Sequence, residues 1–399
     1  MLFGLAHQSL LIFDLFDRSL TNANMVVIAT SGAGKSFCLK LLVLRQLAEG
    51  VGSFIIDPDD EYRRLCAAVG GQYIRLALAS RQAINPLDLP LPSTQDDDEP
   101  RDPVAEQVAS VLTLLELLLA DPGRQLAAAE RALLDRALYA TYAASGITPA
   151  DPTSWSRPAP LLGDLAAELT AQPGDLAASL VVRLERYVSG SLAGLVNRRT
   201  NVSLDGRLVV FSIQQLEKDL QPLAIQIITA YIWGRIRRDR QPRLLVVDEA
   251  WKLLQHPAGA DFLQAMYRRA RKYELGVVAL THRAEDFLAT DHGAAILANT
   301  AVKLLLKQTE TSVRTVAQLF ALTSGEERDL LGARKGEGLF FARGSRVALT
   351  VVACPEEHDL ATSDPREVAA LEAAAHTEAA SAALPSGTSV SFRPEGRQR

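Results

Sequence analysis

A glycine-rich segment near the start of the chain has the composition of a phosphate-binding loop. Residues 29–36 read ATSGAGKS and directly follow the apolar run 25–28. Gly32 and Gly34 allow the backbone to curl, so that successive N–H groups form a nest for an anion. A helix expected to begin near Lys35 adds the positive end of its dipole at the same point. The segment therefore predicts a nucleotide phosphate site between a buried strand and a helix.

The residues of this loop have separate predicted roles. Lys35 can reach the β- and γ-phosphates of ATP, and the Ser36 hydroxyl can ligate Mg²⁺. Ala29 stands where the usual motif has its first glycine, which requires a negative φ at that position. A chance glycine-rich turn is the alternative, and the strand, Lys35 and Ser36 together disfavour it. The residues expected to contact the nucleotide are Thr30, Ser31, Gly32, Ala33, Gly34, Lys35, Ser36 and Phe37.

An acidic motif follows another apolar run far downstream. Residues 243–251 read RLLVVDEAW, a strand pattern that ends in two carboxylates. Continuous aliphatic runs are typical of buried parallel strands, and α/β sheets bind ligands at the carboxyl ends of such strands. Asp248 would hold Mg²⁺ through water, and Glu249 would polarise the attacking water, a role typical of hydrolytic motors. Taken alone, the Asp-Glu pair also fits an ordinary helix N-terminus.

Length and composition fit one large α/β unit with additions. A chain of 399 residues favours two domains over a single core. The formal net charge of −5 argues against a uniformly basic nucleic-acid-binding protein, although a local basic channel stays open. Cys38, Cys66 and Cys354 lack metal-ligand spacing, so we expect reduced thiols in the cytosol. We expect no transmembrane segment, because no apolar run approaches about 20 residues, and the N-terminus has no signal-peptide pattern.

The apolar runs predict a mostly parallel sheet that is covered by helices on both faces. Strands are expected at 25–30, 53–57, 208–213, 244–248, 276–281, 301–307, 338–342 and 346–353, with a short strand at 10–13. The runs 338–342 and 346–353 are joined by Arg343-Gly344-Ser345. They predict an antiparallel hairpin at the sheet edge.

The segment between the two chemical motifs is helical in pattern. A polar, proline-bounded stretch at 91–103 leads into helices expected at about 108–119, 125–144, 161–171 and 175–187. We therefore expect an all-helical insert at 93–200 that separates the two halves of the α/β domain, 1–92 and 201–362. Residues 363–399 are rich in Ala and Glu and then in Pro, Ser and Gly, which predicts a loose helix followed by a mostly disordered tail.

Further polar residues near the ends of expected strands are candidate site residues, and each has a functional and a structural interpretation. Asp57 and Glu61 follow the second expected strand. They either line the nucleotide pocket, with Glu61 contacting the catalytic water or a neighbouring subunit, or cap a helix. The basic run at 268–272 mostly fits a solvated helix face. Within it, Arg271 is our first choice for an arginine finger that reaches the γ-phosphate of a neighbouring subunit.

Together these motifs resemble the VirB-four (TraC/TraE-type) ATPases of conjugation and type IV secretion, within the HerA/FtsK-like P-loop group. The resemblance runs over about residues 1–360 and is most specific at 57–62 (DPDDEY) and 248–251 (DEAW), with support at 22–37, 85–87, 270–273 and 280–287. It implies a RecA-like P-loop NTPase with a mostly parallel sheet and an inserted all-helical subdomain. It also implies ATP hydrolysis with Mg²⁺ at the inner membrane, for substrate export or pilus assembly.

Two features depart from the pattern of that family. Its members usually have Gln where His282 ends the sensor strand. A histidine can also donate to the γ-phosphate, with added pH dependence, or it can make a structural hydrogen bond at the strand end. The family usually carries a large N-terminal domain, whereas this chain starts at the first strands of the motor. Docking to the membrane machinery is therefore open.

The resemblance also implies partners and a location. We expect a homo-hexamer when the protein is active, with a monomer as the alternative for the isolated chain. The expected location is cytoplasmic and peripheral at the inner face of the cell membrane, with secretion-apparatus proteins as partners and DNA as an open possibility. Two other functions remain: a HerA/FtsK-like DNA-pumping translocase, and a nucleotide-gated scaffold with little turnover. The DEAW block and the lack of a winged DNA-binding domain disfavour the first, and the complete set of Lys35, Ser36, Asp248 and Glu249 disfavours the second.

Overall fold

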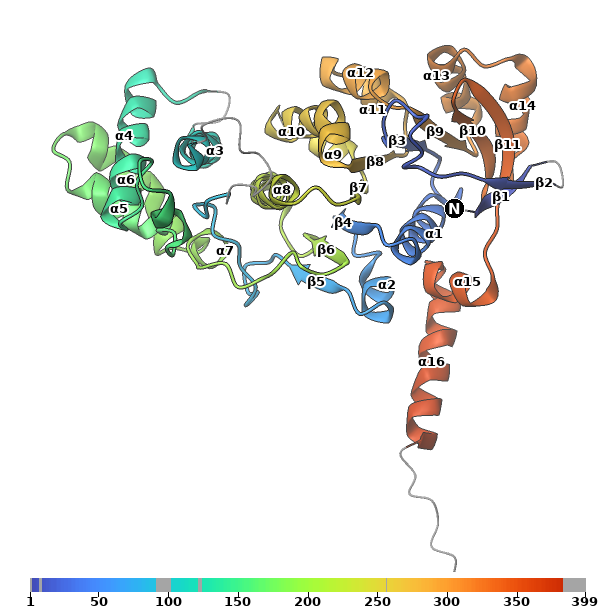
Figure 1. The fold of residues 1–399 in the computed structure, drawn as a ribbon, viewed down its shortest axis with the longest axis horizontal. Helices are drawn as coiled ribbons and strands as arrows, with labels where there is room; N and C mark the ends of the chain where they lie inside the picture. The colour runs from blue at the N-terminus through green and yellow to red at the C-terminus, as the bar shows by residue number, and fades with distance from the viewer. Residues whose placement is uncertain (1, 7–8, 91–101, 121–123, 256, 383–399) are drawn as a thin grey trace, which may run out of the picture.

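The computed structural model describes residues 2–6, 9–90, 102–120, 124–255 and 257–382 (Figure 1). Its strands form one sheet in the order β2-β1-β11-β10-β9-β3-β8-β7-β4-β6-β5. The strands are β1 (Leu2–Ala6), β2 (Ser9–Ile12), β3 (Met25–Ile28), β4 (Gly52–Asp57), β5 (Gln72–Arg75), β6 (Leu208–Ser212), β7 (Arg243–Val247), β8 (Leu275–Thr281), β9 (Val302–Leu306), β10 (Glu337–Ala342) and β11 (Ser345–Val351). The mostly parallel α/β sheet expected from the apolar runs is confirmed.

The parallel part of the sheet brings its strand ends to one edge. From β9 through β3, β8, β7, β4 and β6 to β5, all neighbouring strands pair in parallel. β3 lies between β8 and β9, with Ile28 opposite Thr281 and Leu305. The carboxyl ends of β3, β7 and β8 therefore meet at the same edge, where parallel sheets bind ligands.

The last two strands form the expected antiparallel hairpin, but its predicted place at the sheet edge is wrong. β10 and β11 are joined by Arg343 and Gly344, both with positive φ (53° and 77°), as a two-residue hairpin turn requires. β11 pairs with β1, and β1 pairs with β2, so the edge strand is β2. β1 and β5 were not predicted. β5 is short and only one of its residues, Ile74, is buried, so it lacks the apolar run that marks the other strands.

Helices cover both faces of the sheet. They are α1 (Lys35–Ala48), α2 (Arg63–Ala68), α3 (Pro103–Leu119), α4 (Ala128–Ala144), α5 (Leu162–Thr170), α6 (Asp175–Val188), α7 (Ala193–Val196), α8 (Gln221–Arg238), α9 (Trp251–Leu254), α10 (Pro257–Arg269), α11 (Glu285–Leu288), α12 (Asp291–Ala298), α13 (Glu310–Phe320), α14 (Ser324–Gly332), α15 (Pro355–Ala361) and α16 (Pro365–Ala382). Short 3₁₀ helices lie at Pro152–Ser156 (η1), Lys218–Leu220 (η2) and Ala270–Tyr273 (η3).

Alternation along β3 shows how the two faces are packed. Met25 and Val27 belong to a core cluster with residues of α1 and α2, whereas Val26 and Ile28 belong to a second cluster with residues of α8 and α10. All four side chains of β3 are buried, so the strand is covered from both sides. This sandwiching fixes the position of the loop that follows β3.

A helical unit is inserted between β5 and β6. Helices α3 to α7 fill the described part of this segment and stand to one side of the sheet (Figure 1). Their apolar residues continue the core cluster that includes α8 and one face of the sheet. α3 contacts α8 directly, which ties the insert to the α/β domain. The acidic stretch within the expected linker, residues 96–99, lies outside the described residues.

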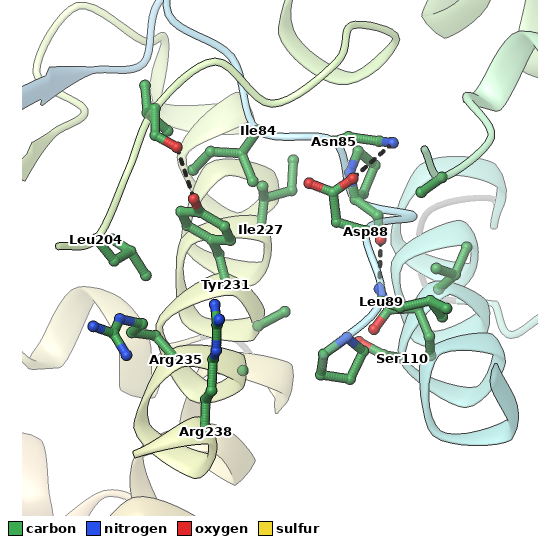
Figure 2. A pocket seen from close by; sticks show the side chains of 18 of the residues that line it. Ile84, Asn85, Asp88, Leu89, Ser110, Leu204, Ile227, Tyr231, Arg235 and Arg238 are labelled. Carbon is green, nitrogen blue, oxygen red and sulfur yellow. Dashed lines mark hydrogen bonds between the residues drawn. The ribbon is translucent and has the colours of Figure 1, made fainter. Parts of the chain in front are cut away.

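A cavity of about 470 Å³ lies where the insert meets the α/β domain (Figure 2). Its walls come from α8, α3, residues 155–159 of the insert and both connecting segments, around residues 84–90 and 202–205. Figure 2 shows Arg235 and Arg238 of α8 on one side, with Leu89 and Ser110 across from them. The lining includes no residue of 29–36 or 248–249, so this cavity is separate from the expected nucleotide site.

The chain's last described segment crosses the outer side of α1. α15 packs against α1, where Arg45 forms a two-pronged ion pair with Glu357 through Nε and Nη2, at 2.8 and 2.7 Å. α16 then projects away from the body of the molecule (Figure 1). The disorder expected at the end of the tail falls on 383–399, outside the described residues. In the described segments, no helix combines the length and apolar character that crossing a bilayer demands.

Candidate functional site

The phosphate-binding loop is anchored between the ends of its neighbouring strands. The Thr30 amide and hydroxyl both donate to the Lys307 carbonyl, at 3.1 and 3.0 Å. The Ala29 amide donates to the Thr281 carbonyl at 3.3 Å. Ala29 is not among the described residues with positive φ, so alanine is tolerated at the position of the first motif glycine. The loop is thus held from both sides before the glycines begin.

The two motif glycines adopt backbone conformations that other residues avoid. Gly32 has φ of 77° and Gly34 has φ of 92°, both in the left-handed region. α1 begins directly after Gly34 and runs for 14 residues, so its N-terminal dipole faces the loop. This is the backbone geometry in which successive N–H groups form an anion nest.

A second loop, which sequence reasoning missed, closes against Gly34. The Gly336 amide donates to the Ala33 carbonyl at 2.9 Å. A Cβ on Gly34 would lie 3.2 Å from the Gly336 nitrogen and 3.3 Å from Cγ of Lys335. The loop between α14 and β10 therefore packs on the phosphate-binding loop and brings a lysine beside it. In the sequence, the loop differs from its surroundings only by two basic residues and a glycine at 334–336. These residues do not indicate that the loop packs against the phosphate-binding loop.

The two acidic residues follow β7 in an unusual backbone conformation. Glu249 has φ of 51°, which is uncommon for a residue with a side chain and marks functional sites more often than chance. The turn is held by two hydrogen bonds: the Glu249 amide donates to Asp248 Oδ1 at 2.9 Å, and the Ala250 amide donates to the Leu280 carbonyl at 2.7 Å. Trp251 Nε1 donates to Glu249 Oε2 at 2.6 Å, which orients the carboxylate.

Four predicted residues meet around one ammonium group. Lys35 Nζ lies 2.5 Å from Glu249 Oε1 and 3.5 Å from Asp248 Oδ1. His282 Nε2 lies 2.7 Å from the same Glu249 oxygen and 3.3 Å from Lys35 Nζ. Lys35, Asp248 and Glu249 are nearly buried, with 5, 5 and 6 % of their surface exposed. Three segments far apart in the sequence thus form one charged cluster at the carboxyl edge of the sheet.

The electrostatics of the cluster favour an ionised Glu249. Burial raises the pKa of Glu249, but the hydrogen bond from His282 and the charge of Lys35 outweigh burial and lower the pKa to about 2. Burial raises the pKa of the neighbouring Asp248, and the negative charges of Glu61 and Glu249 add to that rise against the opposing effect of Lys35. The hydrogen bond to Glu249 raises the pKa of His282. The neighbouring carboxylates therefore have pKa values that move in opposite directions.

Asp57, the last residue of β4, and Glu61, on the loop that follows, lie beside this cluster. The Asp57 carboxylate accepts the backbone N–H groups of Glu61 and Tyr62, at 3.1 and 2.9 Å. Both amides precede α2, which begins at Arg63 with no side-chain cap and no acid in its first turn, so the helix-capping interpretation is wrong. Burial raises the pKa of Asp57 to about 7. Oε2 of Glu61 is buried and has no hydrogen-bond partner among the described residues. Tyr62 donates its hydroxyl to Asp248 Oδ2 at 3.2 Å, a contact that the sequence did not predict.

The structure leaves Arg271 apart from the other predicted residues. Arg271 lies in η3, exposed, just before β8 begins at Leu275. His282 follows the opposite end of the same strand, and at about 3.3 Å per residue the strand spans roughly 20 Å. Arg271 is therefore at the amino edge of the sheet, away from the phosphate-binding loop of its own chain. Phe37, on α1, contacts the ring of His358 at 5.3 Å between centroids.

The residues present fit a magnesium nucleotide. The curled glycines and the start of α1 suit a polyphosphate. Ser36 in the first turn of α1 and Asp248 offer the oxygen donors that Mg²⁺ prefers. The described chain holds no group of three or more His, Cys, Asp or Glu side chains that could share a metal ion. Mg²⁺ is commonly bound through one or two protein oxygens together with phosphates and water, and Ser36 and Asp248 could supply two such oxygens.

Comparisons with known proteins agree with this geometry. Residues 10–339 match the model of the TraG P-loop domain. The chain is 27% identical over 329 residues to Protein TraC of Escherichia coli (strain K12), which covers 78% of the chain and 36% of TraC. The chain thus spans about a third of the length of this curated relative.

Solved structures give the same result. The structure of VirB4 of Thermoanaerobacter pseudethanolicus is similar, with a TM-score of 0.78 and 31% identity, over 90% of this chain and 97% of that one. The plasmid coupling protein TrwB, solved in complex with ADP and Mg²⁺, shares the fold at 15% identity, with a TM-score of 0.53 over 83% of this chain and 86% of TrwB.

Proposed function

Because the chain belongs to the TraG P-loop domain family, as a VirB4/TraC-type ATPase, we propose that it is an ATP-hydrolysing motor that energises substrate transfer or pilus assembly in a conjugation or type IV secretion system. The observation that carries this proposal is the convergence of Lys35, Asp248, Glu249 and His282 at the carboxyl edge of the sheet. A glycine loop that only bound an anion would not require a buried pair of carboxylates beside its lysine.

Each residue has a role in this proposal. Lys35 and the amides of residues 30–37 bind the phosphates, while Ser36 and Asp248 hold Mg²⁺, which neutralises phosphate charge when bound. Glu249 orients and polarises the attacking water, and Trp251 holds its second oxygen. His282 donates to the γ-phosphate. The buried, unpaired oxygen of Glu61 faces the same cluster and is the second candidate to contact water.

The ion pair between Lys35 and Glu249 gives the site two arrangements. At 2.5 Å, the ammonium occupies the oxygen that must act on water. Phosphate oxygens compete for the same ammonium, because Lys35 cannot serve both partners at full strength. Nucleotide binding therefore draws Lys35 away from Glu249 and frees the carboxylate. The freed carboxylate can then accept a hydrogen bond from the attacking water.

The place of Arg271 supports a ring. An arginine at the amino edge of the sheet does not reach its own phosphate-binding loop, so a finger role requires a neighbouring subunit. We propose a homo-hexamer as the active form, located in the cytoplasm at the inner face of the cell membrane. Its partners there would be secretion-apparatus proteins.

Phosphate release by the purified chain tests the proposal. We expect MgATP turnover by the wild type and its loss in Glu249→Gln, with Glu168→Gln in the insert as a matched control that keeps full turnover. Adding duplex DNA separates the motor classes, because a DNA-pumping translocase would be strongly stimulated. ATP binding without turnover, with and without DNA and at all protein concentrations, would instead identify a nucleotide-gated scaffold.

A further inference from the structure

The fully buried Tyr62 contacts the same carboxylate that is assigned to Mg²⁺. The Tyr62 side chain has 0% of its surface exposed, and its hydroxyl donates to Asp248 Oδ2 at 3.2 Å. We propose that Tyr62 is a positioning residue, which fixes the Asp248 carboxylate in the orientation that holds Mg²⁺. The inference rests on the proposed ATPase function and adds a residue that does not itself touch metal or nucleotide.

The two oxygens of Asp248 have different partners. Oδ1 accepts the backbone N–H of Glu249 at 2.9 Å and lies 3.5 Å from Lys35 Nζ. Oδ2 accepts the Tyr62 hydroxyl. A carboxylate held through only one oxygen can rotate about its Cβ–Cγ bond, and a donor on each oxygen prevents this rotation. Tyr62 therefore supplies the second of the two contacts that define the carboxylate plane.

The backbone explains why Tyr62 reaches Asp248. β4 and β7 pair in parallel with Ile56 opposite Val247, so Asp57 and Asp248 leave the sheet side by side. The Asp248 amide donates to the Ile56 carbonyl at 3.2 Å, which extends this pairing by one residue. The loop after Asp57 turns back through Asp60, whose φ is 63°. It ends with Tyr62 directed into the space beside Asp248.

The loop that carries Tyr62 is closed by its own first residue. Asp57 is fully buried and accepts the amides of Glu61 and Tyr62, at 3.1 and 2.9 Å. From the other side, Lys40 Nζ of α1 lies 5.6 Å from the centre of the Tyr62 ring. Lys40 also donates to Ser363 Oγ at 2.6 Å. Asp57 thus fixes the backbone of Tyr62, Lys40 lies over its ring, and α1 links the ring to the phosphate-binding loop.

Other buried tyrosines of the chain show what is special about this contact. The hydroxyl of Tyr142 donates to the Leu87 carbonyl at 2.7 Å, and that of Tyr267 donates to the Met25 carbonyl at 2.8 Å. Both hydrogen bonds are structural and end on the backbone. The Tyr62 hydroxyl ends instead on a carboxylate of the candidate active site. Tyr142→Phe and Tyr267→Phe are therefore matched controls for the loss of a buried hydroxyl.

The test is the Mg²⁺ dependence of nucleotide binding, measured by fluorescence with mant-ATP. In Tyr62→Phe, we expect the Mg²⁺ concentration at half-maximal enhancement of binding to rise by about 10-fold, the lower end of outer-shell effects on metal affinity. Binding in EDTA should stay within about 2-fold of wild type, because Lys35 and the loop amides are untouched. Mn²⁺ affinity in the presence of ADP, followed by electron paramagnetic resonance, should fall in parallel, and Tyr142→Phe should match the wild type in both measurements.

The outcomes separate this inference from the proposed function. If the wild type shows no Mg²⁺-dependent mant-ATP binding, the proposed function is wrong. If the wild type binds as expected and Tyr62→Phe has the same Mg²⁺ midpoint, only the positioning role is wrong. Should Tyr62→Phe fail to fold, Asp57→Asn keeps the hydroxyl but weakens the loop closure. Its Mg²⁺ midpoint should then rise as well, and an unchanged midpoint would overturn the inference.

Discussion

Lys35 and Glu249 are 214 residues apart in the sequence, yet their charged groups lie 2.5 Å apart. The lysine is the first residue of α1, and the glutamate follows β7 in a left-handed conformation. The contact joins the phosphate-binding loop to the acidic turn after β7. In the proposed mechanism, the affinity for nucleotide and the availability of Glu249 to act on water therefore depend on the same ammonium group.

We predict that Lys35→Ala abolishes ATP binding while the fold is retained. The substitution removes the cation for the β- and γ-phosphates and leaves the backbone of the loop in place. Titration calorimetry with MgATP measures the affinity, and circular dichroism checks the fold. An unchanged affinity would show that residues 29–36 are not the phosphate site.

Glu249→Gln should bind MgATP but hydrolyse it about 10²–10⁴-fold more slowly, the size of a general-base contribution. The amide is the same size as the carboxylate, and its oxygen can still accept from Trp251. Single-turnover assays with saturating protein separate the chemical step from binding. Turnover near the wild-type rate would transfer the role of base to another residue, with Glu61 first in line.

Gly34→Ala should be more damaging than Gly32→Ala. Both positions have positive φ, which costs about 1–2 kcal/mol for a residue with a side chain. A Cβ on Gly32 meets no atom within 4 Å, whereas one on Gly34 meets the Gly336 nitrogen at 3.2 Å. Gly34→Ala therefore also displaces the second loop. The two variants are compared by denaturant unfolding and by nucleotide affinity. Equal effects would rule out a role for the contact between Gly34 and the 333–336 loop.

Stability should depend on pH through His282. The hydrogen bond to Glu249 raises the pKa of His282 above 6.5 in the folded protein. Protonated His282 thus stabilises the fold fully below pH 6.5, and this contribution is lost as the pH rises through the folded-state pKa. Between pH 6 and pH 9, the unfolding free energy of the wild type should fall more than that of His282→Gln. Parallel curves for the two proteins in urea titrations would contradict the ion pair.

ATPase activity per chain should rise with protein concentration, because a finger supplied by a neighbour contributes on the order of 10³–10⁵ in rate in related NTPases. Mixing wild type with Arg271→Ala should reduce activity more than in proportion. Arg136→Ala, an exposed arginine of α4 in the insert, is the matched control and should dilute activity only in proportion. A concentration-independent rate together with a fully active Arg271→Ala would reject both the finger and the ring requirement.

Most strands of the parallel sheet could be predicted because each has a continuous apolar run in its own sequence. β3, β4, β6, β7 and β8 are buried along nearly their whole length, so their sequences are continuous apolar runs. β5 has a single buried residue and gave no such run. The edge position of the β10–β11 hairpin was wrong because β11 pairs with β1, a strand more than 300 residues away in the sequence, and no local pattern encodes such a contact.

In the candidate site, sequence reasoning identified residue types but not their partners. Lys35, Asp248 and Glu249 belong to motifs whose spacing follows from phosphate and Mg²⁺ chemistry. The Tyr62 hydroxyl and the 333–336 loop reach the site only through tertiary packing, by way of β4 pairing and the α14–β10 connection. The positive φ of Glu249 could not be predicted from the sequence either, because glutamate, unlike glycine, does not indicate a left-handed conformation.

The position of β3 between β8 and β9 has a consequence for biosynthesis. β3 is made before both of its neighbours: Met25 pairs with Val278 and Val302, which follow roughly 250 residues later or more. At about 5–20 residues per second, this apolar strand waits on the order of tens of seconds without its native neighbours. Nascent chains are thus exposed to aggregation through the segment that later carries the phosphate-binding loop.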